Sequence, residues 1–289
     1  MSALESDIHP DSDGIDHINV YSRGKTNLGR TLSNFAHTPI QHPQHGYFAS
    51  IEAYWYWMAI GDLKDSPKYH NLRSLYGFKC KEEGRKALQH WAEVNNHQLP
   101  VVEDFECHIK KALLCKVQQT EGLADLLKRS TLPLIHYYYW GEKPPYKVSR
   151  PVKYDWITDY LSDIRDFLND NADILVIAGS RQVRDLSLIR GEFVKLQAGR
   201  KVIEIVSGMS PGPDRLGIDI AKEFKLPWAE FPADWNSEPR RAGFIRNVEM
   251  AEYASRGLII WDGRSNGTAH MLEQLKKRSI PYTLINFSE

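Results

Sequence analysis

The sequence is poor in cysteine and has no excess of charge of either sign. Its three cysteines, Cys80, Cys107 and Cys115, lack the CxxC spacing of a zinc site, so we expect reduced thiols and no disulfide framework. The 37 basic and 37 acidic residues cancel, which provides no general attraction to nucleic acid or to an anionic membrane. No apolar run is long enough to span a membrane, and no basic-then-apolar leader opens the chain. We therefore expect a cytoplasmic protein.

Two common signatures of nucleotide-binding loops are also missing. The chain contains neither the dinucleotide fingerprint GxGxxG nor the Walker pattern GxxxxGK[ST]. A nucleotide site in this chain would therefore belong to another lineage.

The last third of the chain alternates short apolar runs with helical stretches. Between Ile174 and Asn286 the runs ILVIA (174–178), VIEIV (202–206) and LIIWD (258–262) each end near glycine and small hydroxyl residues. Five short strands alternating with helices predict a Rossmann-like α/β domain with a parallel sheet. The loops at the carboxyl ends of such strands converge on one crevice, and we expect a ligand there.

These loops have the composition of an anion-binding site. Glycine lets backbone N–H groups approach a phosphate closely, and a following helix presents its positive end. Serine and threonine hydroxyls donate hydrogen bonds, and arginine matches phosphate geometry. Taken one at a time, such turns are equally typical of strand ends and helix caps, and that alternative stays open. The expected ligand-binding residues are Gly179, Ser180, Arg181, Ser207, Gly208, Gly212, Asp214, Arg246, Asn247, Gly263, Ser265, Gly267 and Thr268.

Five ordered motifs in this region are similar to one known superfamily. They are AGSR (178–181), VSG followed by PGPD (206–214), FPADW (231–235), AGFIRNVEM (242–250) and WDGRSNGTAHM (261–271). The region resembles the SLOG superfamily, a Rossmann-like group that includes LOG phosphoribohydrolases, DprA and YspA-like proteins, and the YspA-like branch looks closest. The resemblance implies binding of a nucleotide or a nucleotide-derived ligand.

One loop departs from the hydrolytic members of that superfamily. LOG enzymes have PGGxGTxEE, whose first glutamate acts with an arginine of RKxxM, whereas this chain supplies Arg246 but reads GTAHM. His270 and Met271 stand where the two glutamates would be, and an imidazole does not replace a carboxylate that stabilises an oxocarbenium-like centre. Glu273, about one helical turn beyond His270, is either a substitute or a solvated helix carboxylate. The departure argues against phosphoribohydrolase activity in this domain.

The first half has a different composition and predicts a separate, mainly helical α+β domain. We assign this domain to residues 18–150, after an acidic and flexible N-terminus at residues 1–17. The second domain, 151–289, opens with an amphipathic linking helix near residues 154–169. Within the first domain we expect a strand at 18–21, helices within 50–61, 72–94 and 104–129, and an extended run at 134–141.

One expected helix of the first domain carries a carboxylate among aromatic residues. The segment SIEAYWYWMAIGD (50–62) is apolar nearly all round and predicts a buried helix. Desolvation there would raise the pKa of Glu52, which would suit a general acid or a stabiliser of a carbocation. Alternatively, Glu52 only complements the positive helix end behind an N-cap at Ser50. The local sequence fits both roles.

A second resemblance covers roughly residues 18–140. Four stretches are similar to the NADAR or YbiA-like family: GRTLSNFAHTPI (29–40), GYFASIEAYWYW (46–57), LYGFKCKEEGRKA (75–87) and IKKALLCKVQQ (109–119). This family cleaves N-glycosidic bonds in ADP-ribose-type or ribosylated-base substrates. The resemblance implies catalytic roles for Glu52 and for Asn34 of the SNF motif.

The chain departs from this family at two motifs. Where many members continue to a lysine in SVEHYYQAQK, this chain has Ala59, and the later WGxGxxG element is reduced to Trp140-Gly141. Lys79 and Lys81 are the nearest replacements, although helical lysines are commonly just solvated.

Three histidines crowd the proline-rich loop before the buried helix. His37, His42 and His45 lack helical spacing and a neighbouring carboxylate. We therefore expect no metal ligation there, and no cofactor in either domain.

The two resemblances lead to a main hypothesis and an alternative. In the first, the chain binds an NAD- or ADP-ribose-derived nucleotide or an ADP-ribosylated base and hydrolyses its N-glycosidic bond. Glu52 then assists departure of the base and Asn34 orients the ribose. In the alternative, the chain is a non-catalytic sensor or sequestering protein for a nucleotide signal such as a cyclic ADP-ribose isomer. The domain pairing is similar to the equipment of phage–bacterium conflict systems.

The expected partner is a nucleotide or an ADP-ribose-type small molecule. The balanced charge argues against a membrane and against nucleic acid, except as an ADP-ribosylated substrate. The sequence leaves open whether the chain forms a homo-oligomer.

Overall fold

The computed structural model describes residues 8–97 and 100–287 and divides into two compact units, residues 1–165 and 166–289. The division falls within helix α6 (Asp155–Leu168), whereas the sequence predicted a boundary near residue 150. Most of α6 belongs to the N-terminal unit because its aromatic face packs there. The Trp156 ring stacks on the Trp55 ring with centroids 6.2 Å apart.

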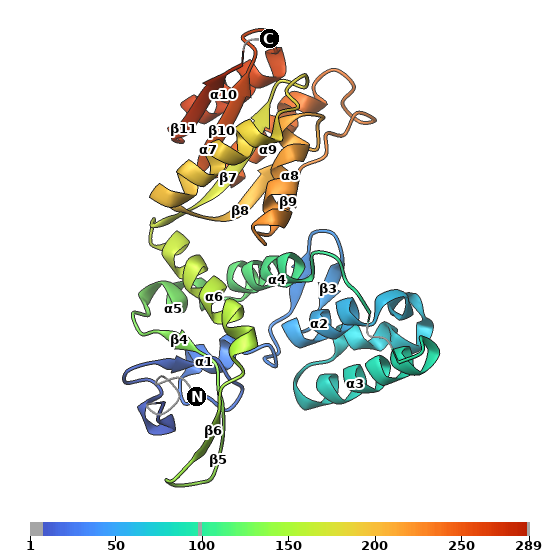
Figure 1. The fold of residues 1–289 in the computed structure, drawn as a ribbon, viewed down its shortest axis with the longest axis vertical. Helices are drawn as coiled ribbons and strands as arrows, with labels where there is room; N and C mark the ends of the chain where they lie inside the picture. The colour runs from blue at the N-terminus through green and yellow to red at the C-terminus, as the bar shows by residue number, and fades with distance from the viewer. Residues whose placement is uncertain (1–7, 98–99, 288–289) are drawn as a thin grey trace. The chain divides into compact units, whose positions relative to one another are not determined.

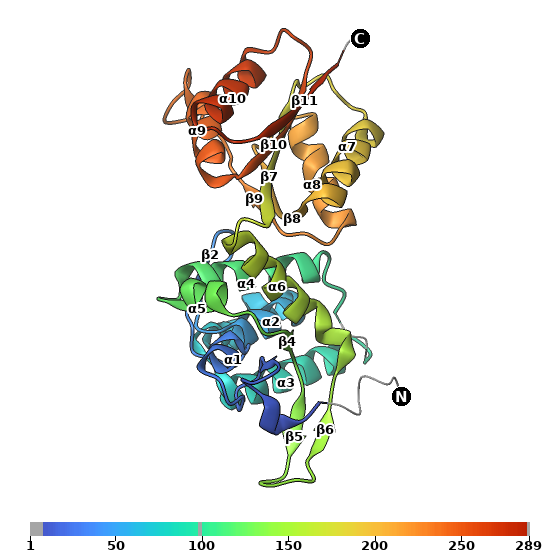
Figure 2. The same cartoon turned by 90° about the vertical axis from the view of Figure 1, so that its left-hand side faces the viewer.

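The C-terminal unit is a three-layer sandwich around a five-stranded parallel sheet (Figure 1). The strand order is β11-β10-β7-β8-β9, and Figure 2 shows helices α7 and α8 on one face and α9 and α10 on the other. The predicted Rossmann-like parallel sheet is thus confirmed. The elements are β7 (Ala172–Gly179), α7 (Leu186–Gly199), β8 (Lys201–Ser207), α8 (Pro213–Glu223), β9 (Trp228–Glu230), α9 (Ala242–Tyr253), β10 (Arg256–Trp261), α10 (Asn266–Lys277) and β11 (Tyr282–Asn286).

The central strands are continuous apolar runs because helices cover the sheet on both faces. All residues of β7 from Ala172 to Ala178 are buried, as are those of β8 from Val202 to Ser207. Asp173 is a charged exception in the apolar strand β7. Its buried carboxylate is paired with Arg256, whose Nε lies 2.5 Å away.

The chain reverses the direction of strand addition between β7 and β10. After β7 it adds β8 and β9 on one side, and then it adds β10 and β11 on the other. Ile260 pairs with Gly179, and the Ser180 N–H donates to the Ile260 carbonyl at 2.9 Å. The carboxyl ends of β7 and β10 therefore border the crevice where open α/β sheets bind ligands.

The N-terminal unit is mainly helical and includes three two-stranded sheets among its described residues (Figure 1). Strand β1 pairs in parallel with β4, whereas β2–β3 and β5–β6 are antiparallel hairpins. No helix in the described part of the chain has the length and apolar composition needed to cross a membrane. The elements are β1 (Ile18–Asn19), α1 (Asn27–Leu32), β2 (Ile40–His42), β3 (Gly46–Phe48), α2 (Ile51–Ala59), α3 (Gly77–Val94), α4 (Phe105–Gln119), α5 (Leu123–Arg129), β4 (Leu134–Ile135), β5 (Tyr138–Trp140) and β6 (Lys147–Ser149), with short 3-10 helices at Pro10–Ser12, Gly61–Asp65, Pro67–Ser74 and Val152–Tyr154.

Helix α2 is the buried helix that its composition predicts. Ser50 caps it, since Ser50 Oγ accepts the Ala53 N–H at 3.0 Å. Helices α3 and α4 pack against α2. Gly84 permits a close approach of α3, because a Cβ at this position would lie 2.1 Å from the Tyr56 ring.

The described part of the expected N-terminal segment, residues 8–17, makes contacts with the residues that follow it. Residues 1–7 lie outside the described residues. Beyond them Asp13 is buried, and its carboxylate accepts the backbone N–H groups of Asn19 at 2.9 Å and of Lys25 at 2.6 Å. A carboxylate that serves as a backbone acceptor anchors this segment, which the acidic composition alone did not reveal.

Candidate functional site

The crevice between β7 and β10 holds a small cavity of about 60 Å³. This volume suits a single anionic group such as one phosphate, since sites for whole small molecules have about 300–1,000 Å³. Ala178, Ser210 and Met271 belong to its wall, although the sequence analysis did not name them as ligand-binding. Ser210 lies in the glycine-rich loop after β8, so the loop composition was a usable signal for it. The wall also brings together eight predicted residues: Gly179, Arg181, Asp214, Arg246, Asn247, Ser265, Gly267 and Thr268.

Five predicted residues lie outside the wall of this cavity: Ser180, Ser207, Gly208, Gly212 and Gly263. Hydrogen bonds of Ser180, Ser207 and Gly208 hold the loops in place. The Ser180 Oγ accepts the Asp262 N–H at 3.1 Å, and the Ser207 hydroxyl donates to the Asp214 carbonyl at 2.7 Å. Gly212 has a φ of +86°, a conformation that favours glycine. These residues therefore shape the site without lining it.

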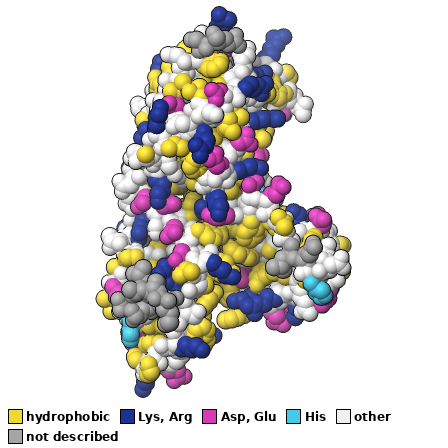
Figure 3. Space-filling model, viewed as in Figure 1, with side chains coloured by type: hydrophobic (Ala, Val, Ile, Leu, Met, Phe, Trp, Pro, Cys, Tyr) yellow, Lys and Arg dark blue, Asp and Glu magenta, His cyan; other side chains and the backbone are white. Residues whose placement is uncertain are grey.

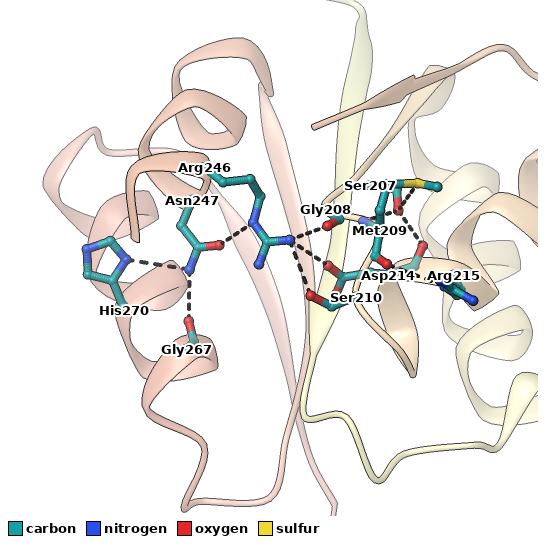
Figure 4. Close-up of polar contacts among 10 residues, drawn as sticks. All are labelled: Ser207, Gly208, Met209, Ser210, Asp214, Arg215, Arg246, Asn247, Gly267 and His270. Atoms are coloured by element: carbon teal, nitrogen blue, oxygen red, sulfur yellow. Dashed lines mark hydrogen bonds and ion pairs between the residues drawn. The ribbon is translucent and has the colours of Figure 1, made fainter. Parts of the chain in front are cut away.

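The Arg246 guanidinium makes hydrogen bonds and an ion pair with neighbouring residues of the C-terminal unit, as Figure 4 shows. Its Nη1 donates to the Gly208 carbonyl and to Ser210 Oγ at 3.3 Å. The same nitrogen lies 3.6 Å from the Asp214 carboxylate. Burial raises the pKa of Asp214 to about 6, although Arg246 favours its charged form. Arg246 thus presents a fixed guanidinium to the cavity, whereas Arg181 is exposed.

The position of the LOG glutamates is occupied by a neutralised histidine. The His270 ring packs edge-on against Phe244, and burial lowers its pKa. Its Nδ1 lies 3.5 Å from Asn247 Nδ2, which donates to the Gly267 carbonyl at 2.9 Å. Glu273 is exposed, as expected of a solvated helix carboxylate. Among the described residues that line this cavity, Asp214 is the one carboxylate, and it is held beside Arg246.

The loop before α10 also has the letters of a nucleophile elbow, a pattern that the sequence analysis passed over. Residues 263–267 read GRSNG, which matches GxSxG. The geometry differs, because Ser265 is the N-cap of α10 with φ −62° and its Oγ accepts the Thr268 N–H. The described residues of the cavity wall include no histidine that could serve as its base.

A larger cavity, of about 350 Å³, lies in the N-terminal unit. It brings the two predicted catalytic residues, Glu52 and Asn34, into one wall, and its volume is in the range of small-molecule sites. Figure 3 shows hydrophobic side chains gathered in a hollow of this unit, beside the lobe that holds α2 and α3. The other lining residues are Val20, Tyr21, Ser22, Ser33, Phe35, Trp55, Tyr56, Lys81, Arg85, His136, Tyr138, Tyr154, Ile157 and Thr158.

Glu52 lies both in the first turn of α2 and in the wall of the cavity. Its backbone N–H lies in the first turn of α2 and donates to the Asn34 carbonyl at 3.0 Å, which joins the helix to the SNF motif. Its side chain is half-buried in the cavity wall, and burial raises the pKa of Glu52 to about 7, against the opposing effect of Lys81 and Arg85. A carboxyl group with this pKa can both hold and release a proton near neutral pH.

A buried lysine holds the loop that carries Asn34. Lys116 of α4 is fully buried, and its Nζ donates to the Ser33 carbonyl at 2.7 Å. Burial lowers the pKa of Lys116 to about 7. The sequence analysis missed this lysine, because its role depends on a contact between segments far apart in the chain.

Two cations of α3 border the cavity. Lys81, one of the two predicted replacements for the missing lysine, lines it, whereas Lys79 is exposed and does not. Arg85 follows Lys81 by four residues and so lies on the same helix face. The sequence analysis missed Arg85, although the helical spacing from Lys81 was a usable signal.

The lining of the cavity also includes aromatic residues and His136. The His136 Nδ1 lies 2.8 Å from the Val20 carbonyl, so Nδ1 carries the hydrogen and Nε2 keeps its lone pair. Burial lowers the pKa of His136, which keeps the ring neutral. The Tyr138 ring packs edge-on against His136 with centroids 4.8 Å apart. The aromatic run before residue 141 therefore supplies a wall of the cavity as well as core packing.

The histidines before α2 separate into two groups. His37 stacks on the Tyr76 ring with centroids 4.3 Å apart. His42 and His45 instead meet His108 of α4, and one ligand atom from each lies within 4.8 Å of the others. Burial lowers the pKa of His42 to about 3 and that of His45 to about 4. The prediction of no metal ligation rested on spacing within one loop and did not anticipate His108.

Comparison with protein families gives one match, to the C-terminal unit. Residues 174–237 match the model YAcAr, described as the YspA, cpYpsA-related SLOG family. Comparisons with curated proteins and with solved structures gave no match. The matched segment runs from β7 past β9 and includes the loop that contributes Ser210 and Asp214 to the small cavity. The C-terminal unit is therefore similar to SLOG domains, which associates it with the binding or processing of nucleotides.

Proposed function

We propose that the N-terminal unit hydrolyses the N-glycosidic bond of an NAD- or ADP-ribose-derived nucleotide or of an ADP-ribosylated base, and that the C-terminal unit binds a related nucleotide. The observation that carries the proposal is Glu52, a desolvated carboxyl with a pKa of about 7 in the wall of a 350 Å³ cavity. The substrate class follows from the resemblance of residues 18–140 to the NADAR family. We also propose that the protein acts in conflict between phages and bacteria.

The proposed reaction uses two groups with complementary protonation states. With an ADP-ribosylated base such as guanine, protonated Glu52 gives its proton to the departing base as the bond between the ribose carbon and the base nitrogen breaks. The nicotinamide of NAD leaves as a neutral base and needs only the stabilisation of the ribosyl cation. Water forms the new carbon–oxygen bond, and its proton passes to the His136 Nε2 lone pair. Before this bond is complete, the ionised Glu52 stabilises the positive charge on the ribosyl centre.

Other residues of the cavity would position the substrate. Asn34 offers both a donor and an acceptor to the ribose hydroxyls. Lys81 and Arg85 are suited to a diphosphate, because Arg binds its oxygens in a fork and Lys acts as a point charge. The rings of Trp55, Tyr56 and Tyr138 offer stacking surfaces to a base.

For the C-terminal unit alone we propose binding without turnover. His270 stands at the position of the first LOG glutamate, and Asp214 is paired with Arg246 in a cavity of about 60 Å³. A site of this kind suits a sensor or a recruiting module for an anionic nucleotide. The alternative for the whole chain, a sequestering protein, predicts that neither unit turns over.

The deciding experiment compares wild type with Glu52→Gln in single-turnover assays on NAD, ADP-ribose, cyclic ADP-ribose isomers and an ADP-ribosylated guanine. Glutamine keeps the shape of the side chain but loses its acidity, so we expect substrate binding to persist and cleavage to fall by about a hundredfold or more. Glu82→Gln, which changes an exposed carboxylate on α3, is the matched control. Intact ligand that is released only by heating wild type would support the sequestering protein instead.

A further inference from the structure

Three histidines of the N-terminal unit converge away from the walls of both cavities. His42 ends β2, His45 lies in the turn to β3, and His108 lies in α4. One ring nitrogen from each lies within 4.8 Å of the others. We propose that His42, His45 and His108 form a binding site for a divalent transition metal, with zinc as the reference ion.

The rings come from elements that hold their positions. His42 pairs with Gly46 in the β2–β3 hairpin, and Arg73 Nη1 donates to the His45 carbonyl at 2.6 Å. Helix α4, which carries His108, packs against β2. Nitrogens that share a tetrahedral zinc ion lie about 3.3 Å apart, so each nitrogen has to move by about 1 Å.

The Tyr54 hydroxyl lies beside two of the three histidines. Its hydroxyl is 2.8 Å from His45 Nδ1 and 3.3 Å from His42 Nε2. On metal binding His45 Nδ1 uses its lone pair for the ion. His42 Nε2 does so once its hydrogen has moved to Nδ1, which otherwise accepts the Gln44 N–H at 3.3 Å. The Tyr54 hydroxyl then turns to a ligand in the remaining coordination position. Mutation of residues that orient metal ligands in this way typically lowers the metal affinity by about tenfold to a hundredfold.

The donor set selects the class of ion. Three imidazoles without a carboxylate among them suit zinc, copper or nickel and disfavour magnesium and calcium, which prefer oxygen ligands. A tetrahedral zinc ion with three protein ligands keeps a fourth position open. Lys64, Arg73 and Lys111 lie close enough to act electrostatically on the rings. They oppose a bare dication and favour an anion in that fourth position, such as hydroxide or chloride.

The test titrates Zn²⁺ and then Co²⁺ into the chelator-treated full chain. We expect one zinc per chain by calorimetry and the intense visible absorption of tetrahedral cobalt. His108→Gln and His45→Gln should lower the zinc affinity by about a hundredfold or more. His70→Ala is the control, because His70 is exposed and outside the cluster.

The outcome does not depend on how well the variants fold, because the cobalt spectrum is first recorded on wild type. Wild type without a tetrahedral cobalt band would overturn the proposal. So would zinc binding that persists in folded His108→Gln and His45→Gln, since this would assign the ion to surface histidines. Loss of stability in these variants, with wild type indifferent to zinc, would identify the cluster as a hydrogen-bonded part of the core.

Discussion

The two units hold buried carboxylates in cavities that differ in size and in their nearest neighbours. In the N-terminal unit, burial dominates at Glu52 and raises its pKa to about 7 in a roomy, aromatic cavity of about 350 Å³. In the C-terminal unit, burial also raises the pKa of Asp214, to about 6, but its carboxylate lies 3.6 Å from the Arg246 guanidinium in a cavity of about 60 Å³. A desolvated acid in a roomy cavity can reach a substrate for proton transfer, whereas a buried carboxylate beside an arginine in so small a cavity serves to hold that arginine in a fixed place. We therefore propose that the first unit carries out the reaction and that the second recognises a ligand.

The largest expected effect is on turnover. His136→Ala removes the proposed acceptor of the water proton, so we expect single-turnover cleavage to fall by about a hundredfold while nucleotide binding by the C-terminal unit is unchanged. In wild type the rate should fall as the pH drops through the lowered pKa of His136 and as it rises above the Glu52 pKa of about 7. The low-pH decline should disappear in the variant. A rate within threefold of wild type would exclude His136 from the mechanism.

The second effect is on stability and concerns Glu52. Its pKa in the folded protein is about 7, above the usual 4.5, so the folded state holds the proton more tightly. The contribution of the protonated carboxyl is complete below pH 4.5 and is lost as the pH rises through 7. Glu52→Gln should therefore match wild type in unfolding free energy near pH 4.5 and exceed it by up to about 3 kcal/mol at pH 8.

Denaturant titrations of both proteins at the two pH values measure this difference. Glu82→Gln controls for general charge effects, since Glu82 is exposed. A variant that is less stable than wild type at pH 8 would show that Glu52 acts mainly as a charged helix-end residue.

The third effect tests recognition in the C-terminal unit. Arg246→Ala should weaken nucleotide binding by about 1.5–3 kcal/mol, the scale of hydrogen bonds to charged groups. Because the change also leaves Asp214 buried without its cation, Arg246→Lys is measured beside it. Arg181→Ala, at an exposed position, should cost less. Unchanged affinity of Arg246→Lys and Arg246→Ala in titration calorimetry would remove Arg246 from the site.

The smallest expected effect on stability is at Gly267, which we compare with Gly208 of the same crevice. A Cβ at Gly267 would have only Ser265 Oγ near it, at 4.0 Å, whereas a Cβ at Gly208 would lie 2.1 Å from Arg246 Nη1. Gly267→Ala should therefore change the unfolding free energy by no more than about 1 kcal/mol, in the direction of greater stability, and still weaken nucleotide binding. Gly208→Ala should destabilise the fold by about 1–3 kcal/mol. Normal binding by Gly267→Ala would place the ligand elsewhere.

The sequence by itself predicted the elements whose residues are neighbours in the chain. Continuous apolar runs ending in glycine and serine turns predicted the parallel sheet, because strands covered on both faces have to be apolar throughout. The all-round apolar segment behind Ser50 predicted α2 and its N-cap, because helix burial and capping depend on residues within one or two turns. The same local logic placed Glu52 in the first turn of α2.

Tertiary structure decided which side chains meet. Lys116 reaches the Ser33 carbonyl, His108 joins two histidines of a distant hairpin, and packing of Trp156 on Trp55 moves the boundary between the units into α6. Eight of the thirteen predicted strand-end residues line the small cavity, while the other five lie outside its wall, a distinction that composition does not predict. The pKa of Glu52 likewise depends on desolvation by residues from several segments. Contacts and burial of this kind arise between residues far apart in the chain, where the local sequence pattern contains no information about distance.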